Sequence, residues 1–232
     1  KKIISKNINC DIIKIIIREV IFMRKLELMK KNICGDIINS QSLPKDKTSV
    51  VVVDMVKGFV DIGVFASPRV KAMVPNIVDL LEKFNEYRNV YFRDSHDAEC
   101  KEFDSYPIHC VRGTEEVEII DDLVKYIKFK DSIIPKNSTN GFVTEGFKTW
   151  LESSIDEWEN LIVVGCITEV CVSQFVLTLK AYLNQNNISK NIIVPMNCVD
   201  TFDAEGHDAE LINVVAFNNM KANGISVVDK II

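Results

Sequence analysis

Several features that would assign a function at once are absent from this sequence of 232 residues. No Cys-x-x-Cys pair occurs, so we expect neither a zinc ribbon nor a dithiol redox site. The glycine-rich loops that bind nucleotide phosphates, Gly-x-x-x-x-Gly-Lys-Ser and Gly-x-Gly-x-x-Gly, are also missing. The net charge is −5, and no basic concentration favours nucleic acid or anionic lipid. We therefore expect a small-molecule substrate, with neither a nucleic acid nor a membrane as partner.

The cysteines and the overall composition indicate one globular domain in a reducing compartment. The seven cysteines lie at irregular spacings, and their odd number argues against a disulfide framework. Reduced thiols in a cytoplasmic protein are the simplest interpretation. Hydrophobic residues make up 47% of the chain and charged residues 26%, which is typical of a domain with a sizeable core. No repeat or low-complexity linker is visible, so we assign residues 47–232 to a single domain.

Residues 1–46 form an N-terminal extension of different composition, because residues 1–34 are rich in Lys, Ile and Asn. The segment Asp11–Phe22 is apolar, but four charged side chains interrupt it, so we do not expect it to span a bilayer. It also lacks the uncharged core and the cleavage site of a secretory signal. Our hypothesis is that the native chain starts at Met23 or Met29, with a short amphipathic helix as the alternative. Mass spectrometry that detects residues before Met23 would contradict it.

Short β-branched runs alternate with helical patterns after residue 48. We expect six strands, at 49–53, 90–93, 131–135, 160–164, 191–195 and 224–228. Helices are expected at 71–87, 115–126, 145–153, 170–184 and 208–222. This alternation predicts an α/β fold: a three-layer α/β/α domain with a mainly parallel six-stranded sheet. The long loop at 95–114 is of the kind that is usually functional.

Chemically active side chains follow several of the expected strands. Asp54, Asp94 and Lys136 come directly after the first three strands, and Cys171 lies just beyond the fourth. His96 follows Asp94 at the same edge. Ligands of open parallel sheets bind outside the carboxyl ends of the strands, so these side chains predict a site at that edge.

Cys171 is the candidate nucleophile. Residues 160–176, NLIVVGCITEVCVSQFV, predict a buried strand, a tight turn at Gly165 and a helix whose first turn contains Cys171. The positive end of the helix dipole favours a thiolate there, and nearby backbone N–H groups are suited to stabilise an oxyanion. A buried structural cysteine is the alternative, and this segment alone does not decide between the two.

Three segments taken together resemble the isochorismatase-like cysteine hydrolases. They are VVVDMVKGF at 51–59, KNSTNGF at 136–142 and VVGCITEVCV at 163–172. The resemblance extends over about residues 48–230. It implies a catalytic triad of Asp54, Lys136 and Cys171. In the family motif Gly-x-x-Thr-Asp-x-Cys-Val, Glu169 stands here in place of Asp.

The chemistry of these residue types fits amide hydrolysis. Asp54 is suited to accept the thiol proton and return it to the leaving ammonia, and Lys136 to stabilise the ionised partners. Cys171 would then form a thioester that water hydrolyses. The resemblance also implies a cis peptide between Cys166 and Ile167, which directs the N–H of Ile167, with that of Cys171, at the oxyanion.

The loop at 94–114, DSHDAECKEFDSYPIHCVRGT, predicts a metal site. The chain contains only three histidines, and two of them lie in this loop. Asp94 and His96 are two residues apart, so both can face one side of an extended segment, and His109 lies in YPIHCVRGT. Each side chain alone is explained as a solvated loop residue. The three beside a candidate nucleophile favour a metal ion.

This loop narrows the resemblance to the nicotinamidases, which carry Asp-x-His, a further ligand and an aromatic-Pro-x-His-Cys segment. The resemblance implies one divalent metal ion and the ligands Asp94, His96, Glu102 and His109. Glu99 and Cys100 remain alternatives to Glu102. These ligand types suit Zn, Fe or Mn and do not separate them.

The same resemblance implies that the substrate is nicotinamide, which is hydrolysed to nicotinate and ammonia. Phe59 and Tyr106 are then expected to line the pocket, with Tyr106 in place of the usual Trp. Residues 137–141 are polar where many relatives carry an aromatic side chain, so another small amide or a ureide is the main alternative. An isochorismatase and a non-catalytic binding relative are further alternatives, and a homo-oligomer is compatible with each of them.

Overall fold

A parallel sheet of six strands forms the centre of the protein. The computed structural model describes residues 2–85 and 88–232. The sheet order is β4-β3-β2-β5-β6-β7, and every neighbouring pair is parallel. The strands are β2 (Thr48–Val53), β3 (Val90–Asp94), β4 (Ile133–Lys136), β5 (Asn160–Gly165), β6 (Asn191–Pro195) and β7 (Ser226–Val228). The predicted fold class and all six strands are confirmed.

Helices cover both faces of this sheet because its central strands are apolar on both sides. In β2, Val50 and Val52 belong to one buried cluster, whereas Val51 and Val53 belong to the other. The first cluster packs against α2 (Lys57–Val60), α3 (Pro68–Ala72), α4 (Val74–Lys83) and α5 (Asp121–Val124). The second packs against α6 (Glu145–Ser154), α7 (Ser173–Gln185) and α8 (Ala209–Ala222). The result is the predicted three-layer arrangement.

The strand order has one reversal, and β2 lies at it. From β2 the chain builds outward through β3 and β4, and it then returns to the other side of β2 with β5. The loops after β2 and β5 therefore leave the sheet in opposite directions and open a crevice between them. Asp54 follows β2 and Cys171 follows β5, so the topology brings both to this crevice.

Gly165 closes β5 at a position where no other residue fits. Its φ is +114°, a backbone conformation that L side chains rarely adopt. A Cβ at this position would lie 2.0 Å from the carbonyl oxygen of Val53 in the neighbouring strand. The close approach allows the turn that leads from β5 toward Cys171.

Two predicted helices are shorter than the sequence pattern suggested. The helix expected at 71–87 is divided into α3 and α4 around Met73, because Pro75 falls at a helix start, and α4 ends at Lys83. Residues 86–87 of that prediction lie outside the described residues. The helix expected at 115–126 is a 3₁₀ turn followed by the short α5.

Further short elements were not predicted. A two-stranded parallel sheet pairs β1 (Ile37–Ile38) with β8 (Lys230–Ile231). Besides Glu115–Val117, single 3₁₀ turns occur at Ser40–Ser42, Lys45–Lys47, Lys101–Asp104, Lys130–Ser132, Gly141–Val143 and Met196–Cys198. Their patterns are too short for a helical or strand period to be visible in the sequence.

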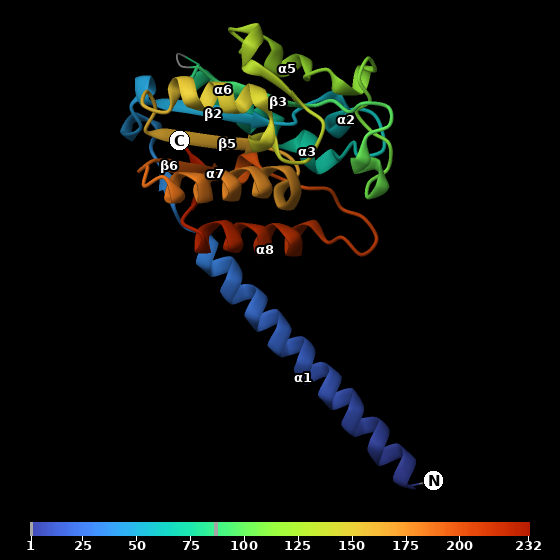
Figure 1. Ribbon diagram of the computed structural model, residues 1–232. Helices are drawn as coiled ribbons and strands as arrows, with labels where there is room; N and C mark the ends of the chain where they lie inside the picture. Colours follow the sequence, from blue (N-terminus) through green and yellow to red (C-terminus); the bar gives the residue numbers. More distant parts are fainter. Residues whose placement is uncertain (1, 86–87) are drawn as a thin grey trace.

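Helix α1 (Lys2–Ile33) is much longer than the amphipathic helix considered as an alternative for this segment. Its last turns lie against α8, where Asn32 and Asn218 share a hydrogen bond of 2.8 Å. The rest of α1 projects away from the domain (Figure 1). Among the helices of the described chain, α1 included, none combines the length and apolar character that a bilayer span requires.

Replacement of Gly165 by alanine tests the packing of the turn after β5. Gly165→Ala is expected to lower the free energy of unfolding by roughly 3–5 kcal/mol, because a strained φ adds to a backbone clash. Gly206→Ala is the matched control, since its φ is +78° but no atom lies within 4 Å of the added Cβ. The control should lose only about 1–2 kcal/mol. If urea unfolding showed equal losses of stability for the two variants, the close approach of Gly165 to β2 would not be the cause of the loss.

Candidate active site

Four side chains meet at the carboxyl edge of the sheet because of strand register. Asp94 and Lys136 are the last residues of β3 and β4, and they are direct partners across the two strands. Asp54 follows β2 with a φ of +52°. Cys171 lies in the π-helical turn Thr168–Val172, immediately before α7. All four side chains are buried.

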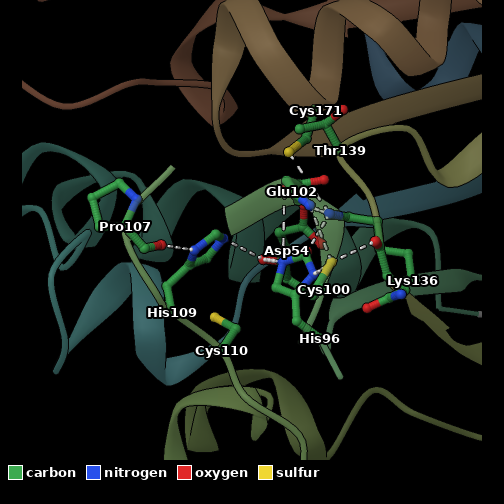
Figure 2. A network of polar contacts seen from close by, with 12 residues as sticks. Asp54, His96, Cys100, Glu102, Pro107, His109, Cys110, Lys136, Thr139 and Cys171 are labelled. Atoms are coloured by element: carbon green, nitrogen blue, oxygen red, sulfur yellow. Dashed lines mark hydrogen bonds and ion pairs between the residues drawn. The ribbon is translucent and has the colours of Figure 1, made fainter. Parts of the chain in front are cut away.

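The ammonium group of Lys136 lies at the centre of this group (Figure 2). Its Nζ is 2.9 Å from Oδ2 of Asp54 and 2.6 Å from Oδ1 of Asp94. The same nitrogen is 3.8 Å from Sγ of Cys171. The structure therefore brings together the three residues expected to form a triad. It also adds Asp94, which the sequence had suggested only as a metal ligand.

The two carboxylates stabilise the charge of Lys136. Burial alone would lower the pKa of this lysine, but Asp54 and Asp94 raise it well above its usual value. Burial alone would raise the pKa of Asp94, but Lys136, His109 and His96 lower it below its usual range. At neutral pH the Lys136–Asp94 contact is therefore an ion pair.

Asp54 has a different protonation behaviour from Asp94. Burial raises the pKa of Asp54 to about 7, because the opposing effect of Lys136 does not compensate for the loss of water. The carboxyl group also interacts with the thiol of Cys171. A buried carboxyl with a pKa near neutrality is suited to accept and donate protons.

Burial of Cys171 opposes the effect that the helix end was expected to have on its thiol. Burial raises the pKa of Cys171 well above its usual value, and Asp54 and Asp94 raise it further, whereas Lys136 opposes them only in part. The thiol lies in a turn that precedes the α-helix and is 5% exposed, and desolvation is the largest cause of its raised pKa. Nucleophilic attack by this thiol requires a base that removes its proton.

The turn between β5 and Cys171 has the backbone that the resemblance implied. The peptide bond between Cys166 and Ile167 is cis. The thiol of Cys166 donates a hydrogen bond of 3.3 Å to the carbonyl oxygen of Asp54, so this cysteine joins the two loops and does not enter the crevice. Ile167 lines the same pocket as Cys171.

A second cluster adjoins the first one through Asp94. Oδ2 of Asp94 is 2.9 Å from Nε2 of His96 and 3.1 Å from Nε2 of His109. The possible ligand atoms of these three buried residues lie within 4.8 Å of one another. Nδ1 of His109 donates a hydrogen bond of 2.7 Å to the carbonyl oxygen of Pro107, which leaves the lone pair of Nε2 directed at Asp94.

Convergence of acceptor atoms makes this cluster suited to a cation. A carboxylate oxygen and an imidazole lone pair repel each other unless a proton or a metal ion lies between them. Burial alone would lower the pKa of His109, but the hydrogen bond to Asp94 raises it overall, so a proton competes with a metal ion for Nε2. The residues present therefore fit a divalent metal ion.

The three alternatives for the further ligand differ in their position relative to His96. Oε1 of Glu102 is 3.7 Å from Nε2 of His96, on the same side of the ring as Asp94. Glu99 is exposed. The thiol of Cys100 is 3.4 Å from Nδ1 of His96, which is the opposite ring nitrogen. The structure places a carboxylate oxygen of Glu102 near the ring nitrogen that Asp94 also contacts.

One pocket of about 340 Å³ is lined by residues of both clusters. Cys171 and the cluster residues Asp94, Glu102 and His109 all contribute to its wall. Phe59 and Tyr106 line it as expected from the sequence. Its further lining residues were not predicted: Phe65, Thr139, Glu169, Val170, Phe202, His207 and Ile212.

Several aromatic rings line the pocket and contact one another. The ring centroid of Phe65 lies 4.8 Å from that of His109 and 6.0 Å from that of Phe202. His207, which the sequence did not suggest for the site, stacks on Phe202 at 4.2 Å and contacts Glu169 at 2.9 Å. Among the described residues that line the pocket, none is Lys or Arg.

The six-stranded parallel sheet with helices on both faces is the fold of isochorismatase-like hydrolases. The chain belongs to the isochorismatase family, since residues 48–227 match the isochorismatase domain.

Nicotinamidases are among its relatives. Nicotinamidase 1 of Arabidopsis thaliana is 30% identical over 234 residues, which cover 88% of this chain and 94% of that protein. A nicotinamidase from Bacillus subtilis has a similar structure, with a TM-score of 0.65 and 21% identity over 79% of this chain and 99% of that one. A pyrazinamidase of Pyrococcus horikoshii in complex with zinc has a TM-score of 0.61 and 20% identity over 78% and 98%.

Removal of the buried ammonium tests its structural role. Lys136→Met leaves two buried carboxylates without their shared cation, so the free energy of unfolding at pH 7 is expected to fall by about 3–5 kcal/mol. Lys148→Met is the control, because Lys148 forms an exposed ion pair of 2.7 Å with Glu145. That variant should change stability by less than about 0.5 kcal/mol. Similar urea midpoints for both variants would contradict the assignment.

Proposed function

We propose that the protein is an amidohydrolase that converts nicotinamide to nicotinate and ammonia. The observation that carries the proposal is the pocket that Cys171 shares with Asp94, Glu102 and His109. A substrate bound there lies between the nucleophilic thiol and the group of possible metal ligands. Nicotinamide offers a complementary pair of groups, a carboxamide and a pyridine nitrogen, on one small ring.

Acylation of Cys171 is the first half of the reaction. Asp54 accepts the thiol proton while Sγ forms a bond to the carboxamide carbon. The same proton is transferred to the amino group as the carbon–nitrogen bond breaks, and ammonia leaves. Backbone N–H groups of Ile167 and Cys171 stabilise the negative oxygen of the tetrahedral intermediate.

Hydrolysis of the thioester is the second half. Asp54 removes a proton from water, whose oxygen attacks the thioester carbon, and the carbon–sulfur bond then breaks. Asp54 returns the proton to the sulfur, which restores the thiol. Lys136 stabilises the ionised form of Asp54 whenever that group has lost its proton.

Asp94, His96, His109 and Glu102 are the residues that would hold one divalent metal ion. Such an ion supplies a Lewis-acidic partner for a pyridine nitrogen. Imidazole and carboxylate ligands suit Zn, Fe and Mn alike. These ligands share one pocket with Cys171, so a pyridine ring held beside them would have its carboxamide in the same cavity as the thiol.

The pocket wall favours a neutral aromatic substrate over the competing classes. Isochorismate and N-carbamoyl amino acids carry carboxylates, which pockets commonly bind through Lys or Arg side chains. No Lys or Arg is found among the described residues lining this one, whereas Phe59, Phe65, Tyr106 and Phe202 offer faces and edges for a ring. The pocket lining therefore favours nicotinamide over isochorismate and over an N-carbamoyl amino acid.

Release of ammonia from nicotinamide by the purified protein tests this function. Cys171→Ala should reduce the rate by at least about 10³-fold, because no other group can form the thioester. Cys198→Ala, which removes a buried thiol outside the site, should retain full activity. Treatment with a chelator should lower the rate, and added Zn²⁺, Mn²⁺ or Fe²⁺ should restore it. Undiminished turnover by Cys171→Ala would overturn the mechanism.

The protonation of Asp54 predicts the pH profile. Only its ionised form accepts the thiol proton, and its pKa is raised to about 7. The value of kcat/KM should therefore rise about tenfold per pH unit below pH 7 and level off above it. Metal content is measured at each pH so that loss of the ion is separated from protonation of Asp54. A flat profile between pH 5.5 and 8.5 at constant metal content would contradict this role.

A further inference from the structure

Cys100 is a buried thiol that contacts His96 from outside the cluster formed by Asp94, His96 and His109. It directly precedes the 3₁₀ turn Lys101–Asp104 and is 7% exposed. Its Sγ lies 3.4 Å from Nδ1 of His96, whereas Asp94 contacts Nε2 of the same ring. Figure 2 shows Cys100 beside His96, within the network that links the two clusters. The thiol is therefore placed behind a ligand and not among the ligands.

The hydrogen bonds of this thiol determine which nitrogen of His96 carries a proton. Sγ is 3.3 Å from the carbonyl oxygen of Asn137, which can only accept, so the S–H group donates to it. The sulfur can then only accept from His96, which requires a proton on Nδ1. The lone pair of Nε2 is left free to bind a metal ion, toward Asp94 and Glu102.

The same sulfur also orients the segment that carries Glu102. The backbone N–H of Glu102 donates to Sγ at 3.4 Å, so Cys100 caps the start of the 3₁₀ turn. Ser, Thr, Asp or Asn usually supplies such a cap. The thiol of Cys100 thus contacts the ring of His96, the backbone N–H of Glu102 and the carbonyl oxygen of Asn137 at the same time.

A backbone group, and not a side chain, determines which nitrogen of His109 carries a proton. Its Nδ1 donates to the carbonyl oxygen of Pro107, a group that a side-chain substitution does not remove. His96 depends on a side chain instead. Partners of this kind typically affect metal affinity by 10–100-fold when they are removed.

We propose that Cys100 is a positioning residue that holds His96 in its metal-binding tautomer and Glu102 in reach of the same ion. The inference rests on the metal site of the proposed function. It predicts an effect of Cys100 on metal affinity that does not require the enzyme to be active on any particular amide.

Zinc affinity, measured by competition with a chromogenic chelator, tests the proposal. Cys100→Ala should weaken Zn²⁺ binding by roughly 10–100-fold. Cys100→Ser keeps a donor and an acceptor at this position and should recover most of that loss, which loss of packing alone would not explain. Cys198→Ala is the matched control, since its thiol is buried and contacts only Asn197 among the described polar groups. It should bind Zn²⁺ as tightly as the parent protein.

Two further measurements separate the possible outcomes. In the zinc form, ¹⁵N-resolved NMR of the three histidine rings should show a protected Nδ1–H of His96 in the parent and in Cys100→Ser, but not in Cys100→Ala. In the cobalt form, a thiolate-to-cobalt charge-transfer band that Cys100→Ala abolishes would make Cys100 a direct ligand and overturn the inference.

Equal zinc affinity of Cys100→Ala and the parent protein would overturn the inference while leaving the proposed function intact. A parent protein that binds no Zn²⁺, Mn²⁺ or Fe²⁺ would overturn both the inference and the metal part of the proposed function. If Cys100→Ala does not fold, Cys100→Ser carries the test, because a zinc affinity reduced by more than about 100-fold in that variant would also contradict the proposal.

Discussion

A buried ammonium group is stable only where opposite charges replace the water that it has lost. Lys136 is 2% exposed and meets this condition through Asp54 and Asp94. The condition requires β3 and β4 to pair in the register that sets Asp94 beside Lys136, with β2 next in the sheet. The arrangement of the whole edge therefore depends on one cation, and the sheet order provides its two partners.

Asp94 joins the two halves of the site. One carboxylate oxygen contacts Lys136, and the other contacts His96 and His109. The lysine keeps Asp94 ionised, and an ionised oxygen is what a metal ion requires. Cys100 adds a second link, because its thiol contacts both His96 and the residue after Lys136. Continuous polar contacts thus link the group around Lys136 and Cys171 with the possible metal ligands.

The sheet and most of the candidate site could be predicted from the sequence, because buried parallel strands are continuous apolar runs and their ends are marked by polar residues. The contact of Asp94 with Lys136 could not, since it depends on strand order and register. Phe65 and Phe202 lie in irregular segments with no period to reveal that they face the pocket. The depth at which Cys171 is buried could not be predicted either, because its position in the sequence indicates the helix end but not the desolvation that raises its pKa.

The absence of lysine and arginine from the described pocket lining has a consequence for the end of the catalytic cycle. Under the proposed function a neutral amide enters, but the acid that forms is an anion at neutral pH. Of the three lining carboxylates, Asp94 is paired with Lys136 and would, with Glu102, hold the metal ion, whereas Glu169 contacts His207. No ion pair with a lysine or arginine of the described lining therefore has to be broken when the product leaves.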